Sequence, residues 1–235
     1  FLNLIDVYMD AVLHPLSIEN RMALDQEGWH YEFDEDGKLI RNGVVYSEMK
    51  GVFSNPDSVA FWETMKLLFP DCCYAHESGG DPKHIPELTF EEYKAFHARF
   101  YHPSNARFFL DGKVDVPAVL AKLDAFLREY DRIDVNAVIP FQSPVAKKAT
   151  VKYEVADEDA KDKYILVDGW VLGRFDEREK QLAFSVLSDV LAGSNEAPLK
   201  KALLDRGLCE DVEIGAESVQ QIAAMLTIRN TSKEK

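Results

Sequence analysis

Residues 131–150 separate two patterned parts of this chain, and they constrain its fold more than any other feature. This stretch has neither helical nor strand periodicity, and it contains Pro140 and Pro144. Proline lacks a backbone N–H group and interrupts regular structure. We therefore predict a linker over 131–150, a structured part over 1–130 and a second structured part over 151–235.

The first part has apolar residues mostly at helical spacing. The helices expected there cover residues 2–13, 44–69 with a break at Asn55-Pro56, the segment between the Thr89–Glu92 capping box and Pro103, and a segment that Asp115 and Pro117 open. Turn signals and aromatic residues predict short extended or irregular segments over 27–46. Alternation predicts a strand over 105–110.

The second part mixes strands with helices. Alternating apolar residues predict strands over 151–155, 164–172 and 222–228. Helices are expected over 177–192, after the N-cap candidate Asp176, and over 197–206. The buried face expected for the first of these helices consists of Ala183, Val186, Leu187, Val190 and Leu191. The combination predicts an α+β or α/β architecture in two parts.

Charge excludes some classes of partner. The chain has 41 acidic and 27 basic residues, which gives a net charge of −14. Such a chain should repel nucleic-acid phosphates, and no basic run counteracts this. No apolar run reaches the ~20 residues that a membrane helix needs. The acidic surface either keeps the protein in solution or attracts cationic partners, and both interpretations stay open.

The cysteines and the known catalytic motifs give little direct indication of chemistry. Cys72, Cys73 and Cys209 form no C-x-x-C pair, and their odd number favours a reducing compartment, such as a bacterial cytoplasm or an organelle matrix. Of the six histidines, none belongs to an HExxH or HxxEH motif. His97 and His102 are five residues apart, so they do not share a helix face.

Glu48 departs from the apolar pattern around it. Helical spacing from Val44 to Val52 passes through Glu48, which places a carboxylate on an apolar stripe. A buried carboxylate is costly unless it is paired, protonated or bound to a cation. Glu48 could instead lie at the edge of the stripe and reach solvent. From the pattern alone, solvent exposure is the simpler interpretation, and a metal ligand or a base is the alternative.

Several segments along the chain resemble segments of one protein family, in the same order. Residues 44–51 (VVYSEMKG) resemble the segment that supplies the distal zinc ligand in presequence peptidases, which belong to the pitrilysin family of inverted-motif zinc metallopeptidases. Similar matches occur in SGGDP at 78–82, IPELTF at 85–90 and the 96–107 segment that contains YHPSNAR. APLKKAL with Gly-Leu, over 197–208, resembles the family's second domain.

The resemblance implies a fold, a cofactor and a role for Glu48. Family members have layers of mainly antiparallel sheet covered by helices, and their zinc is held by the two histidines of HxxEH and a later glutamate. That zinc activates a water molecule for attack on a peptide bond. Glu48 matches the later glutamate, so the resemblance implies that it is the distal zinc ligand.

The absent HxxEH motif implies that the chain is one segment of a longer protein. We expect 1–130 to be the later half of a catalytic pitrilysin-type domain, and 151–235 to be the early half of an inactive one. The helix over 177–192 resembles the HxxEH helix but has no histidine. No catalytic residue is therefore expected here, and the segment alone should bind no catalytic zinc and cleave nothing.

The resemblance also implies partners. The full-length parent should be a zinc metalloendopeptidase that degrades oligopeptides such as presequences, and the net charge of −14 would favour cationic peptides. The rest of the parent chain is the other expected partner. The alternative is a non-catalytic pitrilysin-like subunit that binds peptides or acts as a scaffold.

Overall fold

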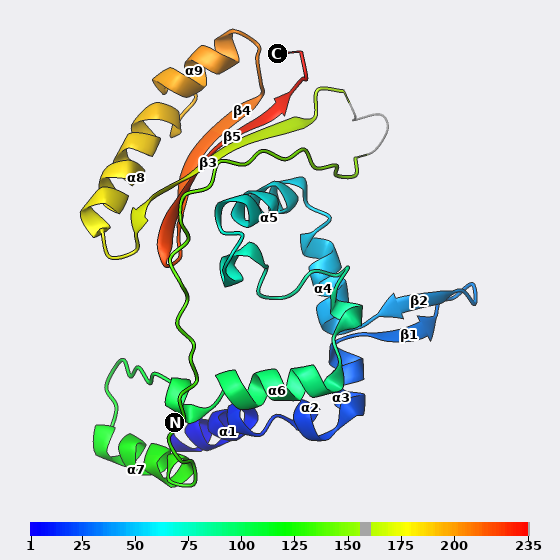
Figure 1. Cartoon of the computed structure of the whole chain (residues 1–235), viewed down its shortest axis with the longest axis vertical. Helices are drawn as coiled ribbons and strands as arrows, with labels where there is room; N and C mark the ends of the chain where they lie inside the picture. Colours follow the sequence, from blue (N-terminus) through cyan, green and yellow to red (C-terminus); the bar gives the residue numbers. More distant parts are fainter. Residues whose placement is uncertain (156–160, 235) are drawn as a thin grey trace. The chain divides into compact units, whose positions relative to one another are not determined.

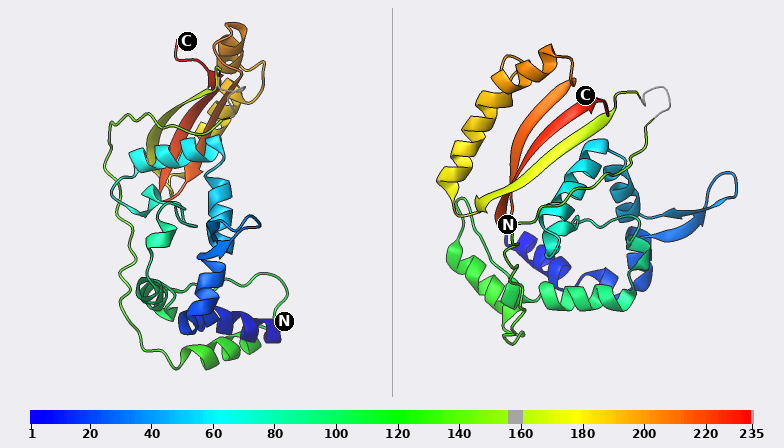
Figure 2. Two further views of the ribbon diagram at one scale, coloured as in Figure 1. Left: turned by 90° about the vertical axis from the view of Figure 1, so that its right-hand side faces the viewer. Right: turned by 45° about the horizontal axis from the view of Figure 1, so that its top comes forward.

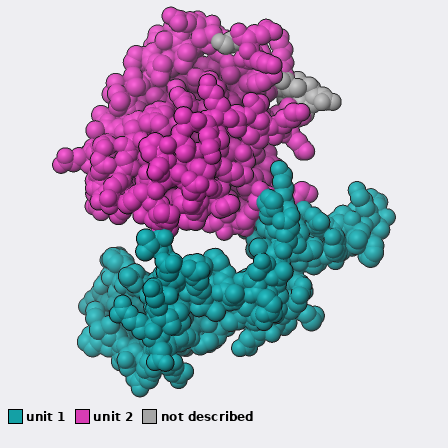
Figure 3. Space-filling model, in the orientation of Figure 1, with its two compact units in different colours: residues 1–48, 82–138 teal, residues 49–81, 139–235 magenta. Residues whose placement is uncertain are grey.

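Figure 1 shows the helices and strands of a computed structural model, which describes residues 1–155 and 161–234. The chain forms two compact units (Figure 3). Unit 1 contains Phe1–Glu48 and Pro82–Val138, and unit 2 contains Met49–Asp81 and Ile139–Lys235. The boundary falls within one helix, so each unit is described by itself.

Unit 1 is mainly helical, as predicted. Its elements are α1 (Leu2–Leu13), α2 (Leu16–Glu19), α3 (Arg21–Glu27), β1 (His30–Phe33), β2 (Leu39–Asn42), the start of α4 (Val44–Val52), η2 (Ile85–Glu87), α6 (Phe90–Phe100), η3 (Pro103–Asn105) and α7 (Val116–Leu127). Strands β1 and β2 pair antiparallel and match the extended segments expected there.

The core of unit 1 lies between α1 and α7. Met9, Val119 and Leu123 are buried there in one cluster. Asp115 accepts a hydrogen bond from the Ala118 N–H and caps α7, as the sequence predicts. The Thr89–Glu92 capping box at the start of α6 is also present.

The predicted strand over 105–110 is wrong. Residues 103–105 form a 3₁₀ helix, and 106–110 have no regular structure. Phe109 is 89% exposed. Within the described residues no strand pairs with this segment. Without a partner strand, the backbone N–H and C=O groups of an extended segment stay unsatisfied, so the alternating residue pattern alone does not make a strand.

Unit 2 is built on an antiparallel sheet. Its elements are the end of α4, α5 (Pro56–Leu68), η1 (Cys73–Ala75), β3 (Tyr164–Arg174), α8 (Arg178–Ala192), α9 (Pro198–Asp205), β4 (Asp211–Ser218) and β5 (Gln221–Thr231). The strand order is β3-β5-β4. Helices α8 and α5 lie on opposite faces of the sheet (Figures 1 and 2), so this part has three layers. Both faces of β5 are therefore covered, and Ile222, Ala223 and Ala224 are fully buried.

Helix α5 packs closely against β3 because β3 has a glycine at the contact. A Cβ atom on Gly169 would lie 2.7 Å from Thr64 Cγ2, which is too close for any side chain to fit unchanged. The buried cluster beneath α5 consists of Met65, Leu68, Phe69, Ala223 and Met225.

Helix α8 forms where it was predicted, but it packs through a different face. Val186, predicted to be buried, is 58% exposed, and the other large residues on that side are also mostly exposed. The helix instead buries Ser188 and Ala192, and Phe184 contacts Trp170 of β3 edge to face. Small side chains let the helix approach the sheet, so they occupy the contact although they are less apolar.

Two other predictions for unit 2 are wrong, and one strand was not predicted. Residues 151–155 have no regular structure, and in this segment the Tyr153 hydroxyl donates a hydrogen bond to the Lys163 carbonyl. The N-cap of α8 is Glu177 and not Asp176. Strand β4 was not predicted, because its sequence DVEIGAES mixes charged and small residues. The strands expected over 164–172 and 222–228 are present in β3 and β5.

The sequence predicted one division of the chain, at the linker over 131–150. The two compact units are instead each made of two separate stretches of the chain. Residues 49–81 group with 139–235 because α5 packs on the sheet. The assignment of 1–130 and 151–235 to two family-type domains stays a prediction. None of the helices in the described part of the chain combines the length and apolar character of a membrane span.

Candidate functional site

The first functional candidate, Glu48, is carried by α4, whose start is fixed by two glycines. Gly43 has φ +140°, and a Cβ atom there would lie 2.4 Å from the Gly28 carbonyl oxygen. Only glycine allows this approach. The Tyr46 N–H then donates to the same Gly28 oxygen at 3.1 Å. The Ser47 hydroxyl donates to Asn42 Oδ1 at 2.9 Å, which adds a second anchor.

Glu48 itself is exposed, and the stripe around it does not face a core. Val44 is 57% exposed, whereas Met49 is only 5% exposed and forms the buried side of α4. The expectation that Val44, Glu48 and Val52 share a core-facing stripe is therefore wrong. Within the described residues the Glu48 carboxylate makes no hydrogen bond or ion pair, so it is available to a ligand.

The described residues do not complete a metal site. Among them, no group of three or more His, Cys, Asp or Glu side chains could hold an ion. A protein zinc site has at least three protein ligands, so Glu48 can supply only one of them. The two histidines of the 96–107 segment have other contacts: His97 Nε2 lies 2.9 Å from the Val12 carbonyl oxygen, and His102 Nδ1 accepts from the Ser104 N–H.

The second candidate is a groove in unit 2 between α8 and β4. Its volume is about 500 Å³. Helix α8 contributes polar side chains, including Gln181, Ser185 and Asp189. The opposite wall is β4, with Ile214 and Ala216 among the lining residues. The groove therefore combines polar side chains of α8 with apolar and acidic side chains of β4.

Strand β4 lies at the edge of the sheet. Its inner edge pairs with β5 from Asp211↔Arg229 to Ser218↔Ile222. Within residues 1–155 and 161–234, no strand pairs with its outer edge. Such an edge offers unpaired N–H and C=O groups to an extended peptide, and a neighbouring groove can receive the peptide's side chains.

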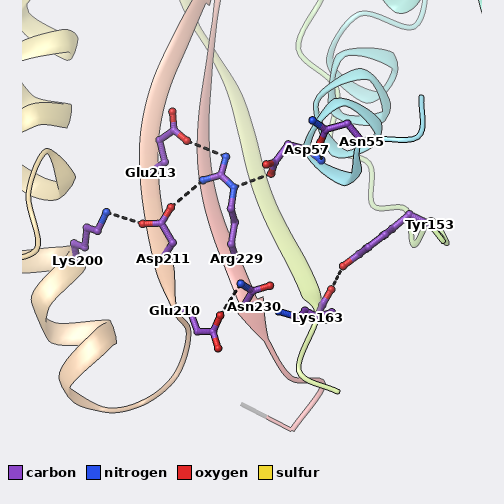
Figure 4. Close-up of polar contacts among 10 residues, drawn as sticks. All are labelled: Asn55, Asp57, Tyr153, Lys163, Lys200, Glu210, Asp211, Glu213, Arg229 and Asn230. Atoms are coloured by element: carbon purple, nitrogen blue, oxygen red, sulfur yellow. Dashed lines mark hydrogen bonds and ion pairs between the residues drawn. The ribbon is translucent and has the colours of Figure 1, made fainter. Parts of the chain in front are cut away.

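Ion pairs fix the position of the first residues of β4. Lys200 of α9 donates to Asp211 Oδ1 at 2.6 Å, and this hydrogen bond is the main reason that the pKa of Asp211 lies below its ordinary value. Arg229 of β5 contacts Asp211, Glu213 and Asp57 (Figure 4). Burial alone would lower the pKa of Arg229, but hydrogen bonds to Asp57 and Glu213 outweigh that effect and raise it.

Residues 87–233, more than half of the chain, match the peptidase M16 inactive domain family. The chain belongs to the peptidase M16 family. This confirms the predicted membership of the pitrilysin-type peptidases, and the antiparallel sheet covered by helices agrees with the fold expected for an M16 protein.

Curated M16 relatives cover almost the whole chain. Protein HypA of Clostridium perfringens is 39% identical over 100% of this chain and 25% of its own length. Presequence protease 1, chloroplastic/mitochondrial, of Arabidopsis thaliana is 39% identical over 89% of this chain and 20% of its own length. The mouse mitochondrial presequence protease is 35% identical over 90% of this chain and 21% of its own length. The chain thus spans only about a fifth to a quarter of the length of these relatives.

Two solved structures have a similar fold. A protease from Helicobacter pylori aligns with 96% of this chain and 65% of its own, with a TM-score of 0.58 and 14% identity. A peptidase M16 inactive domain from Pseudomonas fluorescens aligns over 79% of this chain and 45% of its own, with a TM-score of 0.57 and 24% identity. At these identities the likeness concerns the fold alone.

Sequence reasoning identified Glu48 but missed the groove. The edge strand that forms one wall has alternating residues from Val212 to Ala216, but Gly215 and the three acidic residues of the strand obscured the signal. The resemblance of α8 to the HxxEH helix was the only indication that this helix could border a site.

Proposed function

We propose that this chain is a segment of a zinc-dependent metalloendopeptidase that degrades oligopeptides, in which Glu48 is the distal zinc ligand. The chain's M16 membership supports a peptidase parent, and several relatives are named presequence proteases. The exposed carboxylate of Glu48, which has no partner among residues 1–155 and 161–234, supports the ligand role. The remaining zinc ligands and the general base would come from other parts of the parent.

The observation that carries the proposal is the groove beside the outer edge of β4. An unfolded peptide has free backbone donors and acceptors, which a strand edge can pair without reading its sequence. Ser185 and Asp189 on α8 would meet the peptide's side chains. Unit 2 would therefore hold a peptide by its backbone, and the parent's zinc centre would cleave it.

The substrates proposed are presequence-type or other unfolded peptides, including cationic ones. The net charge of −14 would attract them at long range. We place the protein in a reducing compartment, in accord with its cysteine content. The segment by itself is proposed to bind peptide but to cleave nothing, since it lacks HxxEH.

The alternative is a non-catalytic M16 subunit that binds peptides or acts as a scaffold. The match to the inactive domain family is the observation that favours it. The two proposals share the groove, but only the peptidase requires zinc and a function for Glu48.

Peptide cleavage by the full-length parent distinguishes them. A fluorescence-quenched, presequence-like peptide should be cleaved, cleavage should stop with a chelator and return with zinc, and Glu48→Gln should abolish it. A parent that binds the peptide but never cleaves it would establish the scaffold alternative. Zinc-dependent cleavage by the 235-residue chain alone would contradict the proposed inactivity of the segment.

Pairing at the β4 edge is tested separately with Ala216→Pro in the chain. Proline removes a backbone N–H group and cannot join a ladder. Backbone amide signals of β4 should shift when peptide is added to the unchanged chain. If the proline variant binds peptide equally well, the β4 edge is not the binding surface.

A further inference from the structure

A second pocket lies on the α5 side of the sheet in unit 2. Its volume is about 440 Å³, and it is lined by the first half of α5 and by side chains of β4 and β5. The strand register places Glu213, Gly215 and Glu217 on the same side of β4, opposite the side that Val212 presents to α8. This pocket and the groove beside α8 are therefore on opposite faces of the sheet.

The pocket exists because α5 covers only part of its face of the sheet. Gly169 lets α5 approach β3 closely, so the helix lies over β3 and not over β4. A Cβ atom on Gly215 of β4 would meet no atom within 4 Å. The space above β4 is thus open, and the missing side chain of Gly215 enlarges it.

Two aromatic rings from α5 line this space. Phe61 and Trp62 both contribute to the pocket, with ring centroids 5.0 Å apart and ring planes at 82°. Both side chains also pack against the core beneath α5, which restricts their motion. An indole fixed in this way can bind an apolar chain or a cation over its ring.

The charges in the pocket select between these ligands. Three carboxylates line it, from Asp57, Glu213 and Glu217, together with one guanidinium from Arg229. Arg229 pairs with Asp57 at 2.7 Å and with Glu213 at 2.9 Å, as Figure 4 shows. Within the described residues the Glu217 carboxylate makes no hydrogen bond or ion pair. The pocket is therefore left with excess negative charge next to an indole.

We propose that this pocket, which we call the Trp62 pocket, binds the cationic side chain of a lysine or arginine in a peptide. The alkyl part of such a side chain would pack against Phe61 and Trp62, and its charged end would reach Glu217. An anionic side chain would be repelled by the same carboxylates. The inference rests on the proposed peptide-degrading function and names a feature of the peptides that the segment selects.

The test uses two heptapeptides of alanine and serine with blocked termini, one with a central arginine as its only charged group and one with a central citrulline and no charge. Citrulline keeps the size and planar shape of arginine but lacks its charge, because a urea carbonyl replaces one terminal nitrogen. In the 235-residue chain, the indole N–H NMR signal of Trp62, assigned with Trp62→Phe, should shift with the arginine peptide and not with the citrulline peptide. Added salt should weaken the arginine-dependent shift.

Two variants should remove this preference without unfolding the chain. Glu217→Gln should raise the Kd of the arginine peptide by about two- to fivefold, as expected for an exposed charge pair. Gly215→Leu should fill the pocket and abolish the shift of the Trp62 indole signal. A Cβ atom at this position meets no atom within 4 Å, so the variant should stay folded. Glu179→Gln, which makes the same charge change on α8, is the matched control and should leave the Kd unchanged.

The outcomes separate this proposal from the broader one. If both peptides bind equally and shift β4 amides but not Trp62, the Trp62 pocket is overturned and the peptide-binding groove is retained. If Glu179→Gln weakens binding as much as Glu217→Gln does, only the net charge matters and the pocket is again overturned. If neither peptide binds, the pocket fails, and cleavage by the full-length parent decides the proposed function independently.

Discussion

Nε of Arg229 donates to Oδ1 of Asp57 at 2.7 Å, so an ion pair joins β5 to α5 across 172 residues of sequence. Asp211 and Glu213 of β4 contact the same guanidinium. The Arg229 side chain therefore connects three elements: the edge strand β4, the central strand β5 and helix α5. Only 23% of this side chain is exposed.

Removal of this cation should destabilise unit 2. Arg229→Gln leaves Asp57, Asp211 and Glu213 near one another without compensation, so we expect the free energy of unfolding to fall by about 1–3 kcal/mol. Urea denaturation followed by circular dichroism measures it. Arg178→Gln, an exposed arginine at the start of α8, is the control and should change stability by less than about 0.5 kcal/mol. Equal effects of the two variants would mean that the network adds no stability.

The Asp211 carboxylate should give stability that depends on pH. Its pKa lies below the ordinary value because of Lys200, so the folded state binds this proton less readily than the unfolded state. The stabilisation is therefore fully present above the unfolded pKa of ~3.9 and is lost as pH falls through the lower folded pKa. Unfolding of the chain and of Asp211→Asn should differ most near neutral pH and converge in acid. A difference that grows toward acid would show that the assigned direction is wrong.

Gly169 should tolerate no larger side chain. Gly169→Val would push Thr64 and Leu68 away from β3, and overpacking of this kind costs about 1–3 kcal/mol. Gly215→Val is the matched control on β4, where a Cβ atom meets nothing within 4 Å, and it should be neutral or slightly stabilising. Thermal unfolding of both variants checks this prediction, and it fails if Gly169→Val is as stable as the control.

Gly43 should be equally intolerant of substitution, for two reasons together. Its φ of +140° disfavours other residues, and a Cβ atom would collide with the Gly28 carbonyl oxygen. Gly37 also has a positive φ, but its Cβ position is open, so Gly37→Ala isolates the conformational part, which is about 1 kcal/mol. Gly43→Ala should cost more than Gly37→Ala in the free energy of unfolding. A cost no greater than that of the control would exclude the collision.

The sequence predicted the helices and strands that have strong local signals. The capping box at Thr89 and the N-cap at Asp115 are visible in the sequence because they depend on residues within one turn of the chain. The same signals left α+β and α/β open, and the family resemblance implied the antiparallel, helix-covered sheet that the structure has. The strand predicted over 105–110 failed because strand formation depends on a distant partner, which alternation does not identify.

Packing faces were harder to predict. Helix α8 has large apolar residues on one side and Phe184, Ser188 and Ala192 on another, and the sheet contacts the second side. The decision depends on how closely the helix approaches Trp170, which only the folded sheet defines. Likewise, solvent exposure was the simpler interpretation for Glu48 and is confirmed, but the pattern did not predict that Val44 beside it is exposed as well. The groove at β4 depends on which strand lies at the sheet edge, and no local pattern gives that order.

Zinc content tests the central claim most directly. The full-length parent should bind one zinc ion per catalytic centre when analysed by mass spectrometry, and Glu48→Gln should lose most of it while the protein stays folded. Glu19→Gln, an exposed glutamate in α2, is the control and should retain its zinc. If Glu48→Gln retains zinc as fully as the control, or if the unchanged parent binds none, Glu48 is not a zinc ligand and the account is contradicted.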